Sequence, residues 1–406
     1  MASPLFTRLG DWLRARGEEV YRINFCAGDA LYWRGKPAWN YRGRLEGVAA
    51  FLEKKFSEHG ITDLVLFCDA FPVHRAAVAL AVRANLGVHV FEEGYVRPNW
   101  VTLQRGPRHA AYLMPRDPEW YLEVNARLPD PGEGTPLRAS VAARAVHDMA
   151  YHAANLANPL AYPGYRTHRP YVAAMEYAGW ARRYAHLPWW RRRDPRRIRA
   201  LAGSGAKYFF FPLQLNADAQ VVRNSPFGTM SRAIEQVLTS FARHAPAQTR
   251  LVIKNHPFDT GLANYQRLVD SLDLGGRVEY LETGDLATLF DHAQGVVTVN
   301  STVGFSALQR RIPTKPLGRA VYDLPRLAHQ GSLDDFWRAP QPPDPAVCSA
   351  FRNVLVHATQ INGGLYNDRG IALTLQGCER LFESRSRLEQ LLERFPAAPA
   401  SAMAFS

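Results

Sequence analysis

Three polar stretches each begin where a short apolar run ends. They are Glu92-Glu93-Gly94 after residues 88–91, Asn255-His256-Pro257 after residues 251–254, and Asn300-Ser301-Thr302 after residues 295–299. Pro257 fixes φ and has no N–H, so the chain must leave its strand there. Open α/β sheets bind ligands at the carboxyl ends of their strands. Carboxylates, an imidazole and hydroxyls at three such ends therefore predict a functional site.

Each stretch also has a purely structural interpretation. His256 can be an ordinary turn histidine, Glu92 and Glu93 can lie in a solvated loop, and Ser301 with Thr302 can simply cap a helix. In the functional interpretation, His256 donates to a phosphate oxygen of a leaving group. One of the two glutamates acts as an acid/base group, and the helix start offers hydroxyls and N–H groups to a phosphate. The shared placement of the three stretches favours this second interpretation.

Two further stretches bring polar residues next to predicted strands. Gln214 and Asp218 follow the strand 207–211, and Gly28 lies in a turn after the strand 20–25, close to where a ligand can bind. Asp218 can equally be an acid of a surface loop. The chain has no Asp-x-Asp, paired-cysteine or His-Glu-x-x-His spacing, so no metal is expected. Glycine-rich loops of ATPases and dinucleotide enzymes are also missing, which argues against both classes.

Strands and helices alternate on both sides of these residues. The N-terminal part has expected strands at 20–25, 64–67 and 88–91, with helices at 43–59 and 74–85 between them. The later part repeats this alternation, with strands at 207–211, 251–254, 278–281 and 295–299 and helices at 229–243, 285–292 and 301–310. This rhythm predicts an α/β protein with two parallel, Rossmann-like sheets.

The region between the two sheets has a helical pattern instead. Residues 139–157 and 170–185 are amphipathic, and a basic segment follows them. The resulting division is an N-terminal Rossmann-like domain at 1–114, a helical basic insert at 115–205, a second Rossmann-like domain at 206–330 and a helical tail at 331–406 that packs back on the sheets. A chain of 406 residues is long enough for two hydrophobic cores.

Positive charge is concentrated in the insert. The formal net charge is +12, and residues 182–199 contain eight arginines and one acid. In the middle lie two tryptophans and three arginines, namely Trp189, Trp190, Arg191, Arg192 and Arg193. A solvated basic face explains this equally well, but adjacent tryptophans favour contact with an anionic lipid surface. No nucleic-acid-binding motif accompanies the charge, so nucleic acid is not an expected partner.

The compartment follows from what the chain contains. No window approaches the roughly 18 to 20 apolar residues that span a bilayer, and the first residues lack the apolar core of a signal peptide. The four cysteines lie far apart in the sequence, so we expect reduced thiols, as in cytoplasmic proteins. We expect a cytoplasmic protein that binds peripherally to the inner membrane.

The polar stretches resemble those of a known family. The Glu-Glu-Gly, His-Pro and Ser-Thr series is similar to that of bacterial sialyltransferases and capsule Kdo transferases. The matching segments of this chain are residues 22–29, 91–98, 212–218, 254–257 and 300–304, with a tail segment at 360–366. Together they resemble the capsular polysaccharide biosynthesis family, and the tail resembles its KpsS (LipB) type. The likeness covers about residues 20 to 370.

This resemblance implies a fold and an activity. The fold is a GT-B-like pair of Rossmann-like domains with a helical insert. The activity is transfer of β-Kdo from CMP-Kdo, without cofactor or metal, which starts a linker on a phosphatidylglycerol-type lipid. Partners are then CMP-Kdo, the lipid acceptor, the inner-membrane surface and the capsule export machinery. A non-enzymatic export adaptor and an inverting, sialyltransferase-like enzyme remain alternatives.

The resemblance also implies roles for individual residues. Asp218 is the candidate nucleophile of a retaining double displacement, and Glu92 or Glu93 is then the acid/base group. His256 stabilises the leaving phosphate, and Arg22 or Arg97 offers a cation for the donor carboxylate. The residues expected to bind CMP-Kdo are Gly28, Gly94, Gln214, Lys254, Asn255, Pro257, Asn300, Ser301 and Thr302. Which carboxylate performs which step stays open.

Overall fold

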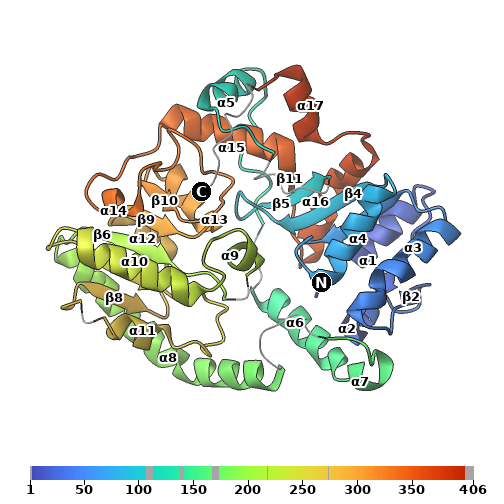
Figure 1. Ribbon diagram of the computed structural model, residues 1–406, viewed down its shortest axis with the longest axis horizontal. Helices are drawn as coiled ribbons and strands as arrows, with labels where there is room; N and C mark the ends of the chain where they lie inside the picture. Colours follow the sequence, from blue (N-terminus) through green and yellow to red (C-terminus); the bar gives the residue numbers. More distant parts are fainter. Residues whose placement is uncertain are drawn as a thin grey trace. The chain divides into compact units, whose positions relative to one another are not determined.

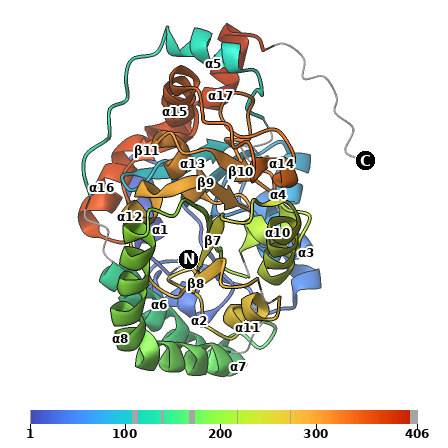
Figure 2. The same cartoon turned by 90° about the vertical axis from the view of Figure 1, so that its left-hand side faces the viewer.

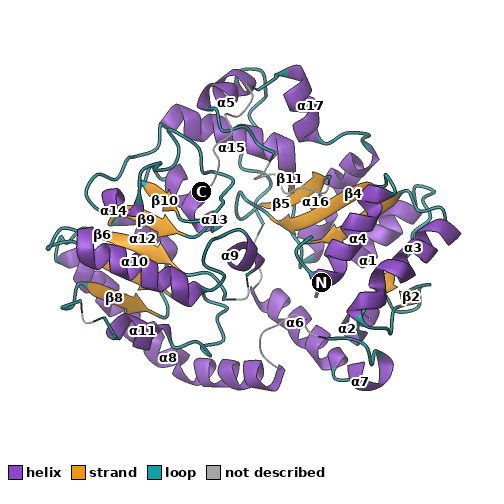
Figure 3. Cartoon of the chain, in the orientation of Figure 1, coloured by secondary structure: helices purple, strands orange, loops and turns teal. Residues whose placement is uncertain are grey.

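The computed structural model describes residues 2–106, 113–137, 141–166, 173–216, 218–272 and 274–397. The chain forms two compact units. Unit 1 contains residues 1–110, 129–168 and 355–396, and unit 2 contains residues 111–128, 169–354 and 397–406. In each unit strands are flanked by helices (Figure 3). The helix α15 (Pro345–Thr359) begins in unit 2 and ends in unit 1.

Unit 1 contains a four-stranded sheet and a separate two-stranded one. Its strands are β1 (Ile23–Asn24), β2 (Trp39–Asn40), β3 (Asp63–Phe67), β4 (Gly87–Glu93), β5 (Trp100–Arg105) and β11 (Gln360–Asn362). Its helices are α1 (Leu5–Arg14), α2 (Ala27–Leu31), η1 (Leu45–Gly47), α3 (Val48–Glu58), α4 (Pro72–Arg83), α6 (Val141–Asn155), α7 (Asn158–Ala161), α16 (Asp368–Gly377), η3 (Cys378–Phe382) and α17 (Arg387–Arg394). The larger sheet has the order β11-β5-β4-β3, and Figure 1 shows the late strand β11 beside β5.

Both faces of this sheet are covered. Val88 and Val90 of β4 pack with α3 and α4, whereas Phe91 packs with α1, α16 and η3 on the other face. Alternate side chains of a strand point to opposite faces. A strand with buried residues at successive positions, as Val88 to Phe91 are, therefore lies between two helical layers.

The topology of unit 1 differs from the expected parallel sheet. β3 and β4 are parallel, but β5 pairs antiparallel with β4, and β11 pairs antiparallel with β5. The expected strand 20–25 is reduced to β1, which pairs with β2 and not with the larger sheet. The predicted crossover from β3 through α4 to β4 is confirmed. The one from the strand 20–25 to β3 is wrong, because β1 does not join the larger sheet. The alternation of Val101 and Leu103 with polar neighbours is the sequence signal for β5.

Unit 2 contains one parallel sheet of order β10-β9-β6-β7-β8. Its strands are β6 (Tyr208–Pro212), β7 (Arg250–Lys254), β8 (Val278–Leu281), β9 (Ala293–Thr298) and β10 (Thr314–Pro316). Its helices are α5 (Pro118–Asn125), α8 (Ala173–Gly203), α9 (Ala219–Arg223), α10 (Met230–His244), α11 (Tyr265–Asp270), α12 (Leu286–Asp291), α13 (Thr302–Gln309) and α14 (Leu333–Phe336). Ser301 caps α13 as the sequence predicted, and Thr229 caps α10.

The strand β6 lies at the centre of two cores. Phe209 and Phe211 pack with α10 and α14 on one face, and Tyr208 and Phe210 pack with α8, α12 and α13 on the other. Figure 2 shows the sheet between α10 on one side and α12 with α8 on the other. The predicted α/β class is confirmed: each unit has a sheet covered by helices, and helical segments lie between the two sheets along the chain.

Those helical segments, expected as one insert at 115–205, are shared between the units. α6 and α7 belong to unit 1, and α5 and α8 belong to unit 2. The predicted helices 139–157 and 170–185 begin outside the described residues. α8 continues to Gly203 although Pro188 and Pro195 lie inside it. Its inward face is buried at Arg183, Asp194 and Ile198, and these contacts hold the helix across its prolines.

Candidate active site

The carboxyl edge of the unit 2 sheet gathers most of the predicted binding residues. β9, β6, β7 and β8 are parallel neighbours, so the loops that follow them lie side by side. These loops begin at Val299, Leu213, Asn255 and Glu282. Parallel α/β sheets bind ligands at this edge. The order of strands thus brings together stretches that lie more than eighty residues apart in the sequence.

Gln214, Asp218 and Asn300 meet at this edge. Gln214 Nε2 donates to Asn300 Oδ1 at 3.0 Å, and the Asn300 backbone N–H donates to Gln214 Oε1 at 3.1 Å. Gln214 Nε2 also lies 3.5 Å from Asp218 Oδ2, while Asp218 Oδ1 accepts the Gln220 N–H at 2.9 Å. The amide pair thus fixes two loops to each other. Asp218 caps α9 with one carboxylate oxygen and turns the other toward Gln214.

Ser301 and Thr302 begin the helix α13. Ser301 Oγ accepts the Val303 N–H at 3.2 Å, and the Ser301 carbonyl accepts the Tyr322 hydroxyl at 2.6 Å. A Cβ at Gly304 would lie 2.2 Å from the Tyr322 hydroxyl oxygen, so only glycine fits in this first turn. The capping interpretation of Ser301 is confirmed. The same helix start carries the positive end of the helix dipole, which suits an anion.

Lys254 is a buried cation at the end of β7. Its residue is 8% exposed, and Nζ donates to the Asn255 carbonyl at 3.3 Å. Burial, together with the nearby Arg183, lowers the pKa of Lys254 to about 8, although Asp194, Asp285 and Glu282 act in the opposite direction. Among the residues that the structure describes, Lys254 forms no ion pair. An anion beside Nζ would restore the charged form.

Asn255 and His256 form a tight turn before Pro257. Asn255 Oδ1 accepts the His256 N–H at 2.8 Å, and Asn255 Nδ2 donates to Glu282 Oε2 at 2.9 Å. His256 Nδ1 accepts the Phe258 N–H at 3.1 Å. The neutral ring therefore carries its proton on Nε2, the tautomer that donates a hydrogen bond. Pro257 itself is exposed and serves to turn the chain.

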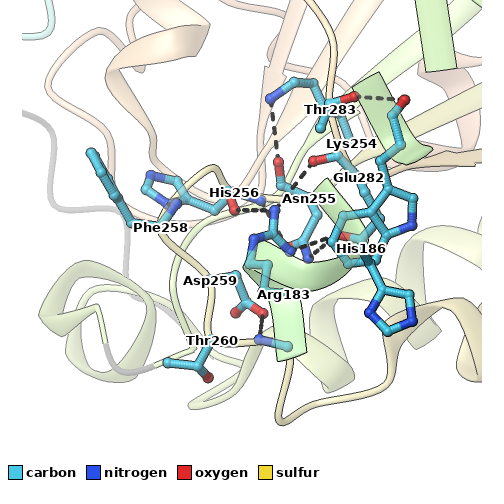
Figure 4. Close-up of polar contacts among 12 residues, drawn as sticks. Arg183, His186, Lys254, Asn255, His256, Phe258, Asp259, Thr260, Glu282 and Thr283 are labelled. Atoms are coloured by element: carbon cyan, nitrogen blue, oxygen red, sulfur yellow. Dashed lines mark hydrogen bonds and ion pairs between the residues drawn. The ribbon is translucent and has the colours of Figure 1, made fainter. Parts of the chain in front are cut away.

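The helix α8 braces this turn, as Figure 4 shows. Arg183 is 4% exposed and donates from Nη1 to Glu282 Oε2 at 2.7 Å. Its Nη2 donates to the carbonyls of Glu282 at 3.2 Å and His256 at 3.4 Å. Because Glu282 also accepts from Asn255, the arginine holds both strand-end loops in place. Sequence reasoning missed Arg183 and Glu282, since neither stands in a spaced motif.

A second brace comes from Asp194, which is fully buried. Its Oδ2 accepts the backbone N–H groups of Glu282 at 2.9 Å and Thr283 at 2.8 Å, and Oδ1 accepts Arg193 Nε at 2.6 Å. The one acid in the basic segment is thus the anchor of α8 on the sheet. The three arginines predicted as a common patch consequently separate.

The structure places the members of that predicted patch on two sides of α8. Arg193 pairs with Asp194 and lies 4.5 Å over the ring of Trp189. Trp190 is half-buried beneath Arg183. By contrast, Arg191 and Arg192 are exposed, and Trp189 is 56% exposed. Only the outer side of the predicted patch is thus open to a surface.

In unit 1 the two adjacent glutamates have different partners. Glu93 Oε1 accepts Arg144 Nη1 and the Tyr366 hydroxyl, both at 3.2 Å, and Arg97 lies 3.6 Å from Oε2. Successive side chains of β4 point to opposite faces, so Glu92 points away from these groups. The expected cation at Arg97 is therefore next to Glu93. Arg22 lies 3.7 Å from Asp29 instead.

Glu92 lies with Cys68 and Asp69, which follow the neighbouring strand β3. Their thiol and carboxylate ligand atoms lie within 4.8 Å of one another. Three such donors can hold a cation, and sequence reasoning missed the set because β3 and β4 had to pair first. The donors mix one soft thiol with two hard carboxylates, which matches no single metal well. The expected metal-free chemistry stays a prediction.

Gly28 and Gly94 have structural reasons to be glycine. A Cβ at Gly28 would lie 2.7 Å from the ring of Tyr151, and the Gly28 N–H donates to Asn155 Oδ1 at 2.8 Å. A Cβ at Gly94 would lie 2.0 Å from the Trp100 carbonyl oxygen. Both glycines permit close packing within unit 1. Their predicted contacts with a donor stay predictions.

Known proteins match most of the chain. A family model described as capsule polysaccharide biosynthesis protein matches residues 62–366. The chain is 34% identical over 372 residues to the capsule polysaccharide modification protein LipB of Neisseria meningitidis serogroup B, covering 89% of each chain. It is 32% identical over 377 residues to the capsule polysaccharide export protein KpsS of Escherichia coli, covering 89% of this chain and 94% of KpsS. Among solved structures, the β-Kdo 2,7 transferase KpsC of Thermosulfurimonas dismutans covers 90% of this chain and all of its own, with 13% identity and a TM-score of 0.43.

Proposed function

Because the chain belongs to the capsule polysaccharide biosynthesis family, and within it to the KpsS and LipB type, we propose that it is a glycosyltransferase. Its donor is CMP-Kdo, and its acceptor is a phosphatidylglycerol-type lipid from which a capsule linker is built. The observation that carries this proposal is the positive strand edge of unit 2. There a buried lysine, a donating imidazole and a helix start surround the ends of neighbouring parallel strands.

This edge suits a leaving nucleotide. When the bond from the anomeric carbon to the phosphate breaks, negative charge develops on the phosphate oxygens. Preorganised donors in a partly buried site stabilise such charge. Lys254 supplies an ammonium, His256 supplies Nε2–H, and the start of α13 supplies its dipole. Arg183 and Asp194 hold these groups in place without contacting the donor.

The stereochemical course depends on which carboxylate attacks or accepts a proton. A retaining double displacement assigns the nucleophile to Asp218, which Gln214 and the start of α9 orient. Glu92 or Glu93 is then the acid/base group for the acceptor hydroxyl. Glu93 is held by Arg97 and Arg144, whereas Glu92 lies with Cys68 and Asp69, and either glutamate can fill this role.

The outer side of α8 supports a lipid acceptor. Tyr184 is 60% exposed and Trp189 is 56% exposed, and Arg191 and Arg192 of the same helix are also exposed. Aromatic rings and arginines together suit the headgroup layer of an anionic membrane. In the part of the chain that the structure describes, no helix is both long and apolar enough to cross a bilayer. Attachment by this face alone is peripheral.

The experiment combines the purified protein with CMP-Kdo and a lysophosphatidylglycerol. We expect CMP release together with a mass gain of one or more Kdo residues on the lipid. His256→Ala should lower turnover about 100-fold, as loss of one preorganised donor does, while the protein stays folded. Lipid binding with no CMP release would instead identify a non-enzymatic export adaptor.

The same mass measurement, made on the protein without acceptor, tests the course of the reaction. A transient Kdo adduct on Asp218 supports double displacement, and Asp218→Asn should then abolish transfer while CMP-Kdo still binds. An active Asp218→Asn variant rules out this nucleophile. An inverting enzyme that resembles sialyltransferases in mechanism predicts no adduct and an essential Glu92 or Glu93.

A further inference from the structure

Unit 1 contains a large cavity away from the strand-end glutamates. Its volume is about 580 Å³, within the usual range for small-molecule sites. It is lined by residues of β1 and β3 together with α1, α3, α4 and η3. β3 is the end strand of its sheet and pairs only with β4, whereas β1 pairs with β2 in a separate sheet. The cavity is therefore lined by strands of two separate sheets.

The wall of this cavity is mainly apolar. Phe6, Leu13, Phe25, Phe67 and Val73 line it, and all of them are only partly buried although they belong to the core clusters of unit 1 or pack against them. Contact between water and these apolar side chains is unfavourable. An apolar ligand that covers them therefore gains binding free energy.

The polar groups of the wall are already engaged. Arg22 lies 3.7 Å from Asp29, and Asp29 Oδ2 accepts the Phe25 N–H at 3.1 Å. His89 Nε2 lies 2.8 Å from Asp63 Oδ1, and His74 Nδ1 lies 2.7 Å from a backbone carbonyl. Burial lowers the pKa of His74 to about 4, so this imidazole is neutral. A sugar or nucleotide would compete with these pairs, whereas an apolar chain would not.

The cavity has a polar opening and an apolar floor. Glu18 and Glu19 are exposed, and Leu9 and Leu66 on its inner wall are buried. Such a gradient suits an amphiphile that enters with its tail first. The acidic opening repels a negative charge next to the tail, as a fatty acid carries. A glycerophospholipid presents a neutral ester at that point and carries its phosphate several bonds further out.

We propose that this cavity binds one acyl chain of a monoacyl glycerophospholipid. The binding itself does not rest on the proposed function. Its use as the tail site of the acceptor does. If the acyl chain binds but no CMP is released, the glycosyltransferase is refuted and this inference stands. If the enzyme turns over but the blocking variants described below bind the acyl chain normally, this inference is refuted and the glycosyltransferase stands.

The test is calorimetric titration of the full chain, without donor, using lysophosphatidylglycerols of eight, ten and twelve carbons below their micelle concentrations. Each buried methylene should raise affinity about fourfold, or roughly fifteenfold for two. Val73→Trp fills the cavity from α4 and should lower the affinity for the twelve-carbon lipid at least tenfold. Val82→Trp, on the same helix but 49% exposed and outside this cavity, is the matched control and should bind normally.

A second blocking variant, Val65→Phe on β3, protects the test against misfolding of the first. Thermal unfolding checks that each variant is intact. Affinity that does not depend on chain length, or an equal loss in Val73→Trp and Val82→Trp, overturns the proposal. Tighter binding of a fatty acid than of the lysolipid with the same chain overturns the assignment to a glycerophospholipid.

Discussion

The two strand-end sites are braced in the same way but differ in depth. In unit 1, α6 supplies Arg144, which lies 3.2 Å from Glu93, and the two side chains are 41% and 32% exposed. In unit 2, α8 supplies Arg183, which lies 2.7 Å from Glu282, and these side chains are 5% and 15% exposed. Both helices come from the stretch between β5 and β6. One brace is solvated, and the other is part of the core.

In the proposed mechanism, the difference in burial suits two different chemical tasks. The buried brace of unit 2 does not contact a reacting group directly. Arg183 binds Glu282, and Glu282 accepts a hydrogen bond from Asn255, which fixes the His256 turn. A rigid set of donors is what a developing phosphate charge requires. The solvated brace of unit 1 contacts Glu93 itself. A carboxylate that stays in contact with water suits the acid/base role proposed for Glu92 or Glu93.

The largest expected effect is on stability. Arg183→Met leaves the Glu282 carboxylate buried without its cation and should lower the free energy of unfolding by about 3 to 5 kcal/mol. Arg144→Met, the matched change in the other brace, should cost about 1 kcal/mol or less, because solvent screens that pair. Urea unfolding of both variants measures the difference. Equal losses would show that the two braces do not differ in the way their burial indicates.

The next effect concerns pH. Burial lowers the pKa of Lys254 to about 8, so its ammonium loses the proton as the pH rises through that value. The groups that face it are Arg183, Asp194, Glu282 and Asp285. CMP affinity should weaken by up to about tenfold per unit above pH 8.

The control for this pH profile is Lys254→Met. We expect weaker CMP binding at every pH and no break near pH 8. A break that survives in this variant would assign the titration to another group. The solvated site of unit 1 offers the contrasting case, because variants of Glu93 should leave the CMP profile unchanged.

Sequence reasoning succeeded where a local pattern marked the end of a strand or the start of a helix. Apolar runs predicted β6, β7 and β9 closely, and Ser301 predicted the start of α13. It also identified Gln214 and Asn300, whose contact depends on the parallel order of β6 and β9. Strand-end residues can be found in this way because parallel sheets bring all carboxyl ends to one edge.

It failed where function depends on contacts between distant elements. Arg183 and Asp194 looked like members of one basic run, although burial gives them a structural role. The cluster of Cys68, Asp69 and Glu92 arises only once β3 pairs with β4. The three-residue strand β11 lies in a helical tail, and its antiparallel partner β5 is about 260 residues earlier. No local pattern carries such information.

The smallest expected effect concerns the outer side of α8. Arg191→Gln and Arg192→Gln should each weaken binding to anionic vesicles by about 1 kcal/mol. The matched control changes two exposed arginines of α10, Arg232 and Arg243, to glutamine and should have little effect. Arg193 behaves differently, because it is tied to Asp194. Equal weakening by both pairs would mean that net charge alone, and not this face, attracts the membrane.

Equilibrium binding of CMP-Kdo tests the central claim most directly. That claim is that the unit 2 edge binds the donor phosphate, while the carboxylates of unit 1 serve the chemical step. His256→Ala and Lys254→Met should each weaken CMP-Kdo binding at least tenfold. Glu92→Gln and Glu93→Gln should leave that binding within about twofold and lower turnover only. Donor binding that is lost in the glutamate variants and retained in the His256 and Lys254 variants would contradict the account.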